Sequence, residues 1–160
     1  MFIEWTTDLD TGIEIIDKQH RKIVDYINQL NLAIQKSDRH QVGQILSKLS
    51  DYTISHLAFE ETLLEKVCYS HLKPHKGVHE MFVKRLEKFQ YKHNSGEDVA
   101  EQLLNMLSVW LIHHIKQSDM DYVSTVGDQL NIFIQSKKTE GWLSKTLAKL
   151  FHYSVPSSAR

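Results

Sequence analysis

Seven side chains of this sequence have the type and the spacing of metal ligands on helices. They are His20, His56, Glu60, His75, His79, His114 and Asp119. Side chains four residues apart share one face of an α-helix, with Cβ atoms about 5–6 Å apart, so two of the pairs could each hold one metal or bridge two. Imidazole nitrogen and carboxylate oxygen suit iron, zinc, copper or manganese. The first prediction is therefore a metal site.

The number of ligands indicates two metal ions rather than one. A closed zinc site needs only four ligands. Two octahedral ions have twelve coordination positions, and these seven side chains with one bridging oxo or hydroxo group fill eleven of them, if both carboxylates bridge. One position then stays open, where a small molecule such as dioxygen would bind. Without metal, burying so many polar groups together would cost about 1–3 kcal/mol for each unpaired group.

The step from His114 to Asp119 does not fit a regular helix. At 100° per residue, a residue five positions later lies roughly 140° from the first side chain. A local π-type turn would bring Asp119 round, and such turns favour functional sites. Asp121 has the better angle, but it lies about 10.5 Å along the axis from His114, too far to share an ion. The spacing therefore predicts a π-turn between His114 and Asp119.

Four segments with apolar residues at helical spacing carry these ligands. Asp38 offers a cap for the second segment, and Ser95 with Asp98 resembles a capping box before the fourth. Short loops between the segments favour an all-α, up-down-up-down four-helix bundle. Residues 1–15 are predicted to form an N-terminal arm packed across it. We expect the bundle with its arm to occupy residues 1–122 and a C-terminal helical extension to occupy residues 123–160.

Residues 142–151 of this extension have an amphipathic helical pattern, with Lys145 and Lys149 on the polar side. The first interpretation is an extra helix packed on its own bundle or on a second copy of the chain. A protein partner or self-association through residues 130–160, or contact with a membrane surface, are the alternatives.

Composition excludes several classes of protein. The chain has 160 residues, a formal charge of −1 and no basic run, so its charge does not favour binding to nucleic acid. No apolar stretch approaches the roughly 18–20 residues that span a bilayer, and the N-terminus lacks the pattern of a secretory signal. Cys68 is the single cysteine, so it is expected to be a free, buried helical thiol, and a cytoplasmic location is expected.

Four sequence blocks resemble the hemerythrin family, and within it the bacterial single-domain members, the bacteriohemerythrins. The blocks are Asp17-Lys18-Gln19-His20, His56-Leu57-Ala58-Phe59-Glu60-Glu61, His75-Lys76-Gly77-Val78-His79-Glu80-Met81-Phe82 and Trp110-Leu111-Ile112-His113-His114-Ile115-Lys116-Gln117-Ser118-Asp119. The resemblance covers roughly residues 5–122, with all seven ligand positions in family order.

The resemblance implies a non-heme centre of two iron ions (Fe²⁺/Fe³⁺) with an oxo or hydroxo bridge. It assigns His75, His79 and His114 to one iron and His20 and His56 to the other. Glu60 and Asp119 bridge the pair. Dioxygen would bind reversibly at the two-histidine iron, which has the open position.

The resemblance also implies an apolar oxygen pocket. Its matching positions are Leu57, Phe82, Trp110, Leu111 and Ile115. Simple core packing is the alternative for all five residues. Leu57 departs from the phenylalanine that family members commonly carry, which could widen the pocket. The extension beyond residue 122 is the larger departure, because the resemblance gives it no role.

The expected function is oxygen storage or delivery, without enzymatic activity. The alternatives are an oxygen or redox sensor that signals through the extension, and di-iron oxidase, peroxidase or nitric-oxide chemistry. Among the other polar residues, Asp17 could orient His20 or be an ordinary acid of the helix N-terminus. His71 is expected in a loop and His113 exposed or behind the ligands. The remaining histidines, His40, His93 and His152, are expected at the surface.

Overall fold

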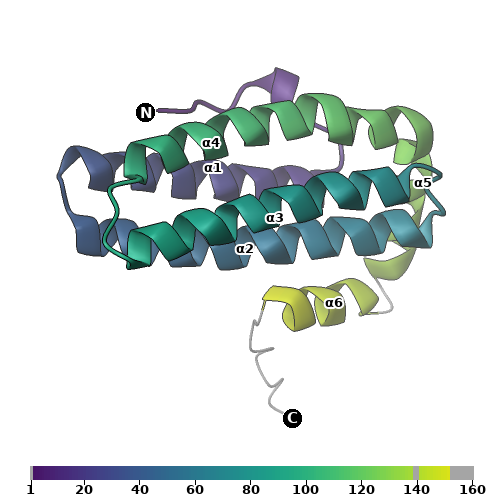
Figure 1. The fold of residues 1–160 in the computed structure, drawn as a ribbon. Helices are drawn as coiled ribbons and strands as arrows, with labels where there is room; N and C mark the ends of the chain where they lie inside the picture. Colours follow the sequence, from purple (N-terminus) through teal and green to yellow (C-terminus); the bar gives the residue numbers. More distant parts are fainter. Residues whose placement is uncertain (1, 139–140, 152–160) are drawn as a thin grey trace, which may run out of the picture.

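A computed structural model describes residues 2–138 and 141–151, and this part of the chain is all-α. Its elements are η1 (Thr7–Leu9), α1 (Glu14–Gln35), α2 (Arg39–Lys66), α3 (Leu72–Asn94), α4 (Ala100–His113), η2 (His114–Asp119), α5 (Met120–Lys138) and α6 (Trp142–Phe151). Helices α1 to α4 run alternately up and down in one bundle (Figure 1). The predicted four-helix bundle is confirmed. None of the described helices is long and apolar enough to cross a membrane.

The bundle forms because each of its helices buries one apolar face. The shared core contains, among others, Ile27 of α1, Leu49 of α2, Leu86 of α3 and Leu103 of α4, all at most 1% exposed. Burying one such side chain contributes roughly 1.5–3 kcal/mol. A fixed core of this kind holds the helices, and any side chain on their inner faces, at constant separation.

The predicted arm packs on α1, as expected. The backbone N–H groups of Phe2 and Ile3 donate to the side-chain oxygen of Asn28, each over 2.9 Å. Leu9 of η1 is buried in the bundle core, and Ile13 is buried just before α1 begins. The arm therefore closes the side of the bundle next to α1 (Figure 1).

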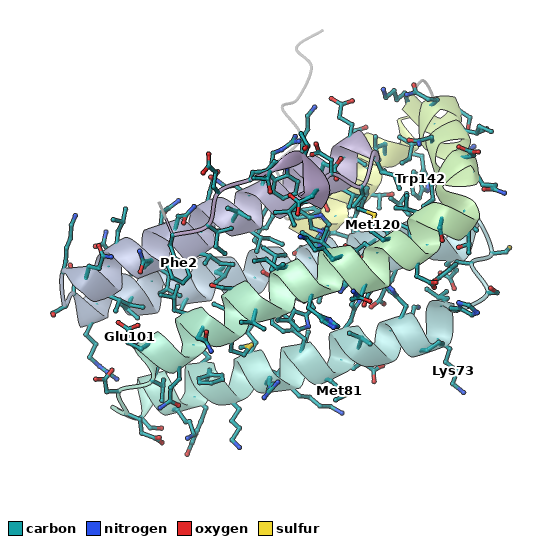
Figure 2. All side chains as sticks on the ribbon, turned by 90° about the horizontal axis from the view of Figure 1, so that it is seen from above. Phe2, Lys73, Met81, Glu101, Met120 and Trp142 are labelled. Carbon is teal, nitrogen blue, oxygen red and sulfur yellow. The ribbon has the colours of Figure 1, made fainter. Side chains whose placement is uncertain are left out.

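The chain does not break between α4 and α5. Figure 2 shows this path from above, passing Glu101 near its start and Met120 beyond the π-helix η2. Figure 1 shows α5 turning across the end of the bundle, toward α6, which lies along α2. The ring of Phe151 lies 5.1 Å from that of Tyr52 and 6.4 Å from that of Phe59. Helix α6 thus packs on its own bundle, the first of the interpretations above.

Three local predictions were wrong. Ser95 does not cap α4, because it is the C-cap of α3, where its hydroxyl donates to the carbonyl of Tyr91. Cys68 is exposed in the turn after α2, with a φ of 55° that a helix excludes. His93 is buried, because its ring packs over Gly43, the one place on α2 where no side chain blocks it. The predicted cap Asp38 is confirmed, since it accepts from the N–H of Gln41.

Candidate metal centre

The seven predicted ligands come from four elements and meet inside the bundle. His20 belongs to α1, His56 and Glu60 to α2, His75 and His79 to α3, and His114 and Asp119 to the π-helix η2. All seven residues are at most 5% exposed. Each lies on the inner face of its helix, so the regular geometry of the bundle is what brings them together.

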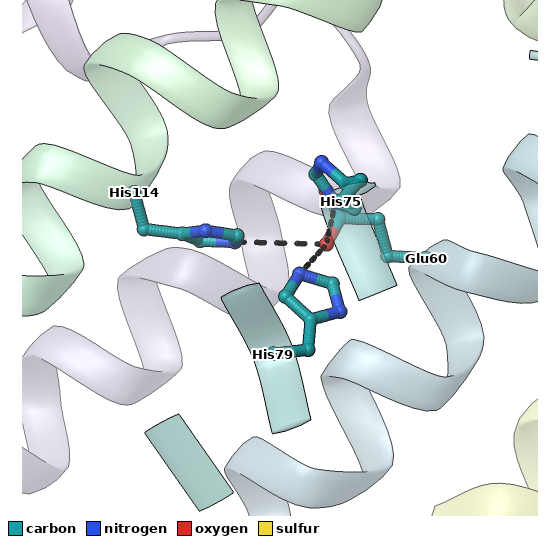
Figure 3. A group of neighbouring side chains, drawn as sticks. All are labelled: Glu60, His75, His79 and His114. Carbon is teal, nitrogen blue, oxygen red and sulfur yellow. Dashed lines mark ion pairs between the residues drawn. The ribbon is translucent and has the colours of Figure 1, made fainter. Parts of the chain in front are cut away.

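Glu60 is the meeting point of one group. Figure 3 shows His75, His79 and His114 pointing toward one oxygen of its carboxylate. The distances from their Nε2 atoms to Glu60 Oε2 are 3.6, 3.4 and 3.7 Å. One ligand atom from each of the four residues lies within 4.8 Å of all the others. A single ion placed between them would have three imidazoles and a carboxylate oxygen.

A second group lies beside the first. Ligand atoms of His20, His56 and His114 also lie within 4.8 Å of one another. Asp119 stands between the groups: its Oδ1 is 3.1 Å from His114 Nε2, and its Oδ2 is 3.3 Å from His20 Nε2. The carboxylate of Asp119 therefore lies between the two groups, with one oxygen near a histidine of each. This is the arrangement that two neighbouring ions with a bridging carboxylate require.

The predicted π-turn is confirmed. Residues His114–Asp119 form a π-helix between α4 and α5. The wider turn removes the roughly 140° offset that a regular helix would place between these two side chains. Both His114 and Asp119 consequently face the interior, where they are at most 1% exposed.

Apart from their ion pairs with one another, the ligand atoms of this site have no partner in the described part of the chain. The Nε2 atoms of all five histidines and both oxygens of Glu60 and of Asp119 are buried without a hydrogen bond. An unpaired buried polar atom costs about 1–3 kcal/mol, and folded proteins contain few of them. A set of nitrogen and oxygen atoms that all face one space fits a pair of metal ions. The residues present therefore suit the di-iron centre that the sequence pattern implies.

Burial sets the protonation of the metal-free site. It lowers the pKa of His56 to about 3, and it holds the pKa values of His20 and His114 below the usual histidine value. Burial would raise the pKa of Glu60, but the His114 and His75 imidazoles beside it hold that pKa well below its ordinary range. These neutral imidazoles and this ionised carboxylate are in the forms that bind metal.

Asp119 behaves in the opposite way. Burial and the negative charge of Glu60 raise the pKa of Asp119 well above its ordinary value. Two carboxylates held close together in a buried site cannot both ionise without a cation. Binding of metal would therefore displace a proton from Asp119, so the ligand side chains would carry one more negative charge with metal than without it.

Two further side chains contact the ligands from behind, and the sequence did not identify them. Gln19 Oε1 lies 2.8 Å from Nδ1 of His56, and Glu61 Oε1 lies 2.7 Å from Nδ1 of His79. Gln19 directly precedes the ligand His20 and Glu61 directly follows the ligand Glu60, and this position beside a ligand is the only sequence signal that pointed to them. Such contacts fix the orientation of a ligating imidazole and its tautomer.

Asp17 does not orient His20. Its carboxylate accepts from the N–H and hydroxyl of Thr11 and from the N–H of Gly12, over 2.8, 2.7 and 3.2 Å. It therefore holds the arm against the start of α1. Nδ1 of His20 has no hydrogen-bond partner.

The other histidines lie outside the site where the structure describes them. His71 is exposed at the start of α3, and its Nδ1 lies 3.1 Å from Asp121, which also accepts from the hydroxyl of Tyr69. His40 and His113 are exposed. Asp121 thus contacts Tyr69 and His71 and is not part of the ligand groups, in agreement with the prediction that it lies too far along the axis to share an ion with His114. His152 lies outside the described residues.

The five residues assigned to an oxygen pocket lie around the ligands. Leu57, Phe82, Leu111 and Ile115 are at most 3% exposed, and Trp110 is half-buried. The ring of Trp110 lies parallel to that of Phe82 at 3.6 Å and to that of His114 at 4.5 Å. On the outer side, a groove of about 350 Å³ is lined by residues that include Leu57, Ala58 and His79. The ligand His79 and the apolar side chain of Leu57 thus both border a surface groove.

Comparison with known proteins supports this geometry. The family model of the hemerythrin HHE cation-binding domain matches residues 11–126. The chain is 40% identical to a bacteriohemerythrin of Pseudomonas aeruginosa (strain PAO1) over 147 residues, or 92% of this chain and 96% of the relative. A bacteriohemerythrin of Stenotrophomonas maltophilia is 41% identical over the same shares. A crystal structure of wild-type hemerythrin is 28% identical, covers 78% of this chain and 97% of its own, and has a TM-score of 0.74.

These matches differ in how much of the C-terminal extension they include. An alignment of 147 residues must continue past residue 122, so relatives from Pseudomonas and Stenotrophomonas share much of the extension. It is therefore not peculiar to this chain. The family model and the crystal structure match the part that carries the ligands. The chain belongs to the hemerythrin family, whose members bind dioxygen at a non-heme di-iron centre.

Proposed function

We propose that the protein binds dioxygen reversibly for storage or delivery in the cytoplasm. The observation that carries this proposal is the set of buried donor atoms that face one another without partners in the protein. His75, His79 and His114 would hold one iron, His20 and His56 the other, and Glu60 and Asp119 would bridge them. A pair of ferrous ions supplies the two electrons that reversible dioxygen binding uses.

The difference between the two groups of ligands supports a carrier. Ligand atoms of His114 lie within 4.8 Å of those of both groups. With His114 assigned to the iron of His75 and His79, as the family resemblance implies, that side would have three imidazoles, and the open position would belong to the side of His20 and His56. The residues around it exclude water: Leu57, Leu111 and Ile115 carry no group that can donate a proton. A dry wall hinders the entry of protons and water, which would convert bound dioxygen irreversibly.

Optical spectroscopy of the reduced, iron-loaded protein tests the proposal. A visible charge-transfer absorption should appear when oxygen is admitted and disappear when oxygen is removed, through many cycles. A permanent change at the first exposure would overturn the carrier function and favour sensing or catalysis instead. Protein that retains one zinc ion and no iron would overturn the di-iron site itself.

One contact favours sensing as a second candidate. The ring of Phe151 in α6 lies 6.4 Å from that of Phe59, the residue next to Glu60. A structural change at the metal centre could therefore reach α6 through the contact between Phe59 and Phe151. If this candidate is correct, protease cleavage near α6 should differ between the reduced and the oxygenated protein. Equal cleavage would remove the support that this contact gives. No comparable observation favours an enzyme.

We expect Leu57→Phe to slow the entry of oxygen. Leu57 is buried, directly follows the ligand His56 and lines the surface groove, so a larger ring there should narrow a path from the groove to the ligands. An effect of about 1.4 kcal/mol on the barrier corresponds to roughly tenfold in rate. Stopped-flow mixing of the reduced protein with oxygen measures it. Ile54→Phe is the matched control, because Ile54 lines the same groove but is 41% exposed. Equal rates in both variants would exclude Leu57 as part of the path.

A further inference from the structure

The two groups of ligands differ in the side chain that supports an imidazole from behind. In the group of His20 and His56, the supporting side chain is Gln19, a neutral amide. In the group around Glu60, it is Glu61, a carboxylate, which supports His79. The distances, 2.8 and 2.7 Å, are nearly equal. Glutamine and glutamate have almost the same shape, so the difference between the two positions is one of charge.

The protons of both imidazoles are fixed by these contacts. Since Nε2 of His56 and of His79 faces the metal space, Nδ1 carries the proton and donates it to Gln19 or to Glu61. A charged acceptor makes a stronger hydrogen bond than a neutral one. It therefore draws the Nδ1 proton away more strongly and increases the electron density at Nε2.

Glu61 is held in place for this role. Its second oxygen, Oε2, lies 3.7 Å from Nζ of Lys76, while Oε1 faces His79. The Glu61 side chain is 23% exposed. The described structure shows no such support at two other ligands, because Nδ1 of His20 and Nδ1 of His114 are buried without partners.

We propose that Glu61 and Gln19 are positioning residues that make the two metal positions unequal. Glu61 makes the His79 position the tighter one and the one that is more easily oxidised. Gln19 leaves the His56 position weaker and less easily oxidised. This inference rests on the proposed di-iron site, but it concerns the affinity and potential of the two positions, not dioxygen.

Two reciprocal substitutions test this proposal. Titration of the metal-free protein with cobalt, followed by its visible spectrum, gives the affinity of each position without iron or oxygen. Glu61→Gln should weaken the tighter position by roughly 10–100-fold, the usual effect of losing such support. Gln19→Glu should strengthen the weaker position. In iron-loaded protein, Glu61→Gln should also move the first midpoint potential to a more positive value.

The control is Glu65→Gln, one helical turn further along α2 on an exposed residue. It removes the same charge without touching an imidazole. The proposal is overturned if Glu61→Gln changes the cobalt affinity and the potential no more than Glu65→Gln does. Because Glu61→Gln retains an acceptor, it should fold, and circular dichroism checks this. Cobalt affinities that follow the proposal in a protein that binds no oxygen would reject the carrier function alone.

Discussion

Replacing Glu60 by glutamine should reduce the metal content from two iron ions per chain to one or none. Glu60 Oε2 is the atom toward which the Nε2 atoms of three histidines point, within 3.7 Å. It also supplies the ionised carboxylate of the metal-free site, since its pKa is held well below the ordinary value against the effect of burial. An amide has no charge to offset that of the ions, and its NH₂ group cannot bind a metal.

Native mass spectrometry and a colorimetric iron assay measure this result directly. Glu65→Gln provides the control, since it removes one carboxylate from an exposed position of the same helix. Misfolding is separated from metal loss by the stability of the metal-free variant. Without metal, the lowered pKa of Glu60 means that its charge stabilises the folded chain, so Glu60→Gln should lower the free energy of unfolding, and circular dichroism checks that the metal-free variant still folds. Two irons bound to Glu60→Gln would show that Glu60 does not bridge the pair.

The ligand set could be predicted from the sequence because it depends on local geometry. The four-residue steps of His56 to Glu60 and of His75 to His79 fix a common helix face whatever the tertiary structure. The five-residue step to Asp119 fits only a wider turn, and the π-helix His114–Asp119 has this form. The up-down topology also follows, because short loops connect antiparallel neighbours.

The residues that support the ligands could not be predicted in the same way. Gln19 contacts a histidine 37 positions away, and Glu61 one 18 positions away, so both contacts depend on how the helices are packed. The sequence allowed the Asp17 carboxylate to contact either His20 or the arm. It contacts the arm because the backbone of residues 11–12 passes beside it. His93 is buried because Gly43 of another helix leaves room for its ring. In each case the partner belongs to a different segment, and single-helix periodicity does not contain that information.

Removing the metal should make the protein sensitive to mild acid. The pKa values of His20, His56 and His114 are lowered in the folded state, mainly by burial, and that of His56 falls to about 3. In the unfolded chain each histidine has a pKa of about 6.5. As the pH falls below about 6.5, these histidines therefore become protonated in the unfolded chain but stay neutral in the folded chain. The free energy of unfolding therefore does not change through these groups above this pH, and it decreases as the pH falls below it.

Asp119 acts in the opposite direction but is a single group. Burial and the charge of Glu60 raise its pKa, so the folded state binds a proton there that an unfolded aspartate releases above a pH of about 4. The proton that folded Asp119 keeps above a pH of about 4 therefore offsets the proton that one histidine binds in the unfolded chain. With about two protons of difference remaining, the free energy of unfolding should fall by up to roughly 3 kcal/mol per pH unit near pH 5. Such a slope is large beside a total stability of about 5–15 kcal/mol.

Urea unfolding of the metal-free protein at several pH values between 7.5 and 5 measures this slope. His56→Gln should reduce it by about one proton, or roughly 1.4 kcal/mol per pH unit, because one depressed pKa is removed. His113→Gln, which changes an exposed histidine of α4, should leave it unchanged. A metal-free protein equally stable at pH 7.5 and 5 would mean that the buried imidazoles take up protons freely. In the loaded protein the same protons must displace iron, so its transition should lie at lower pH.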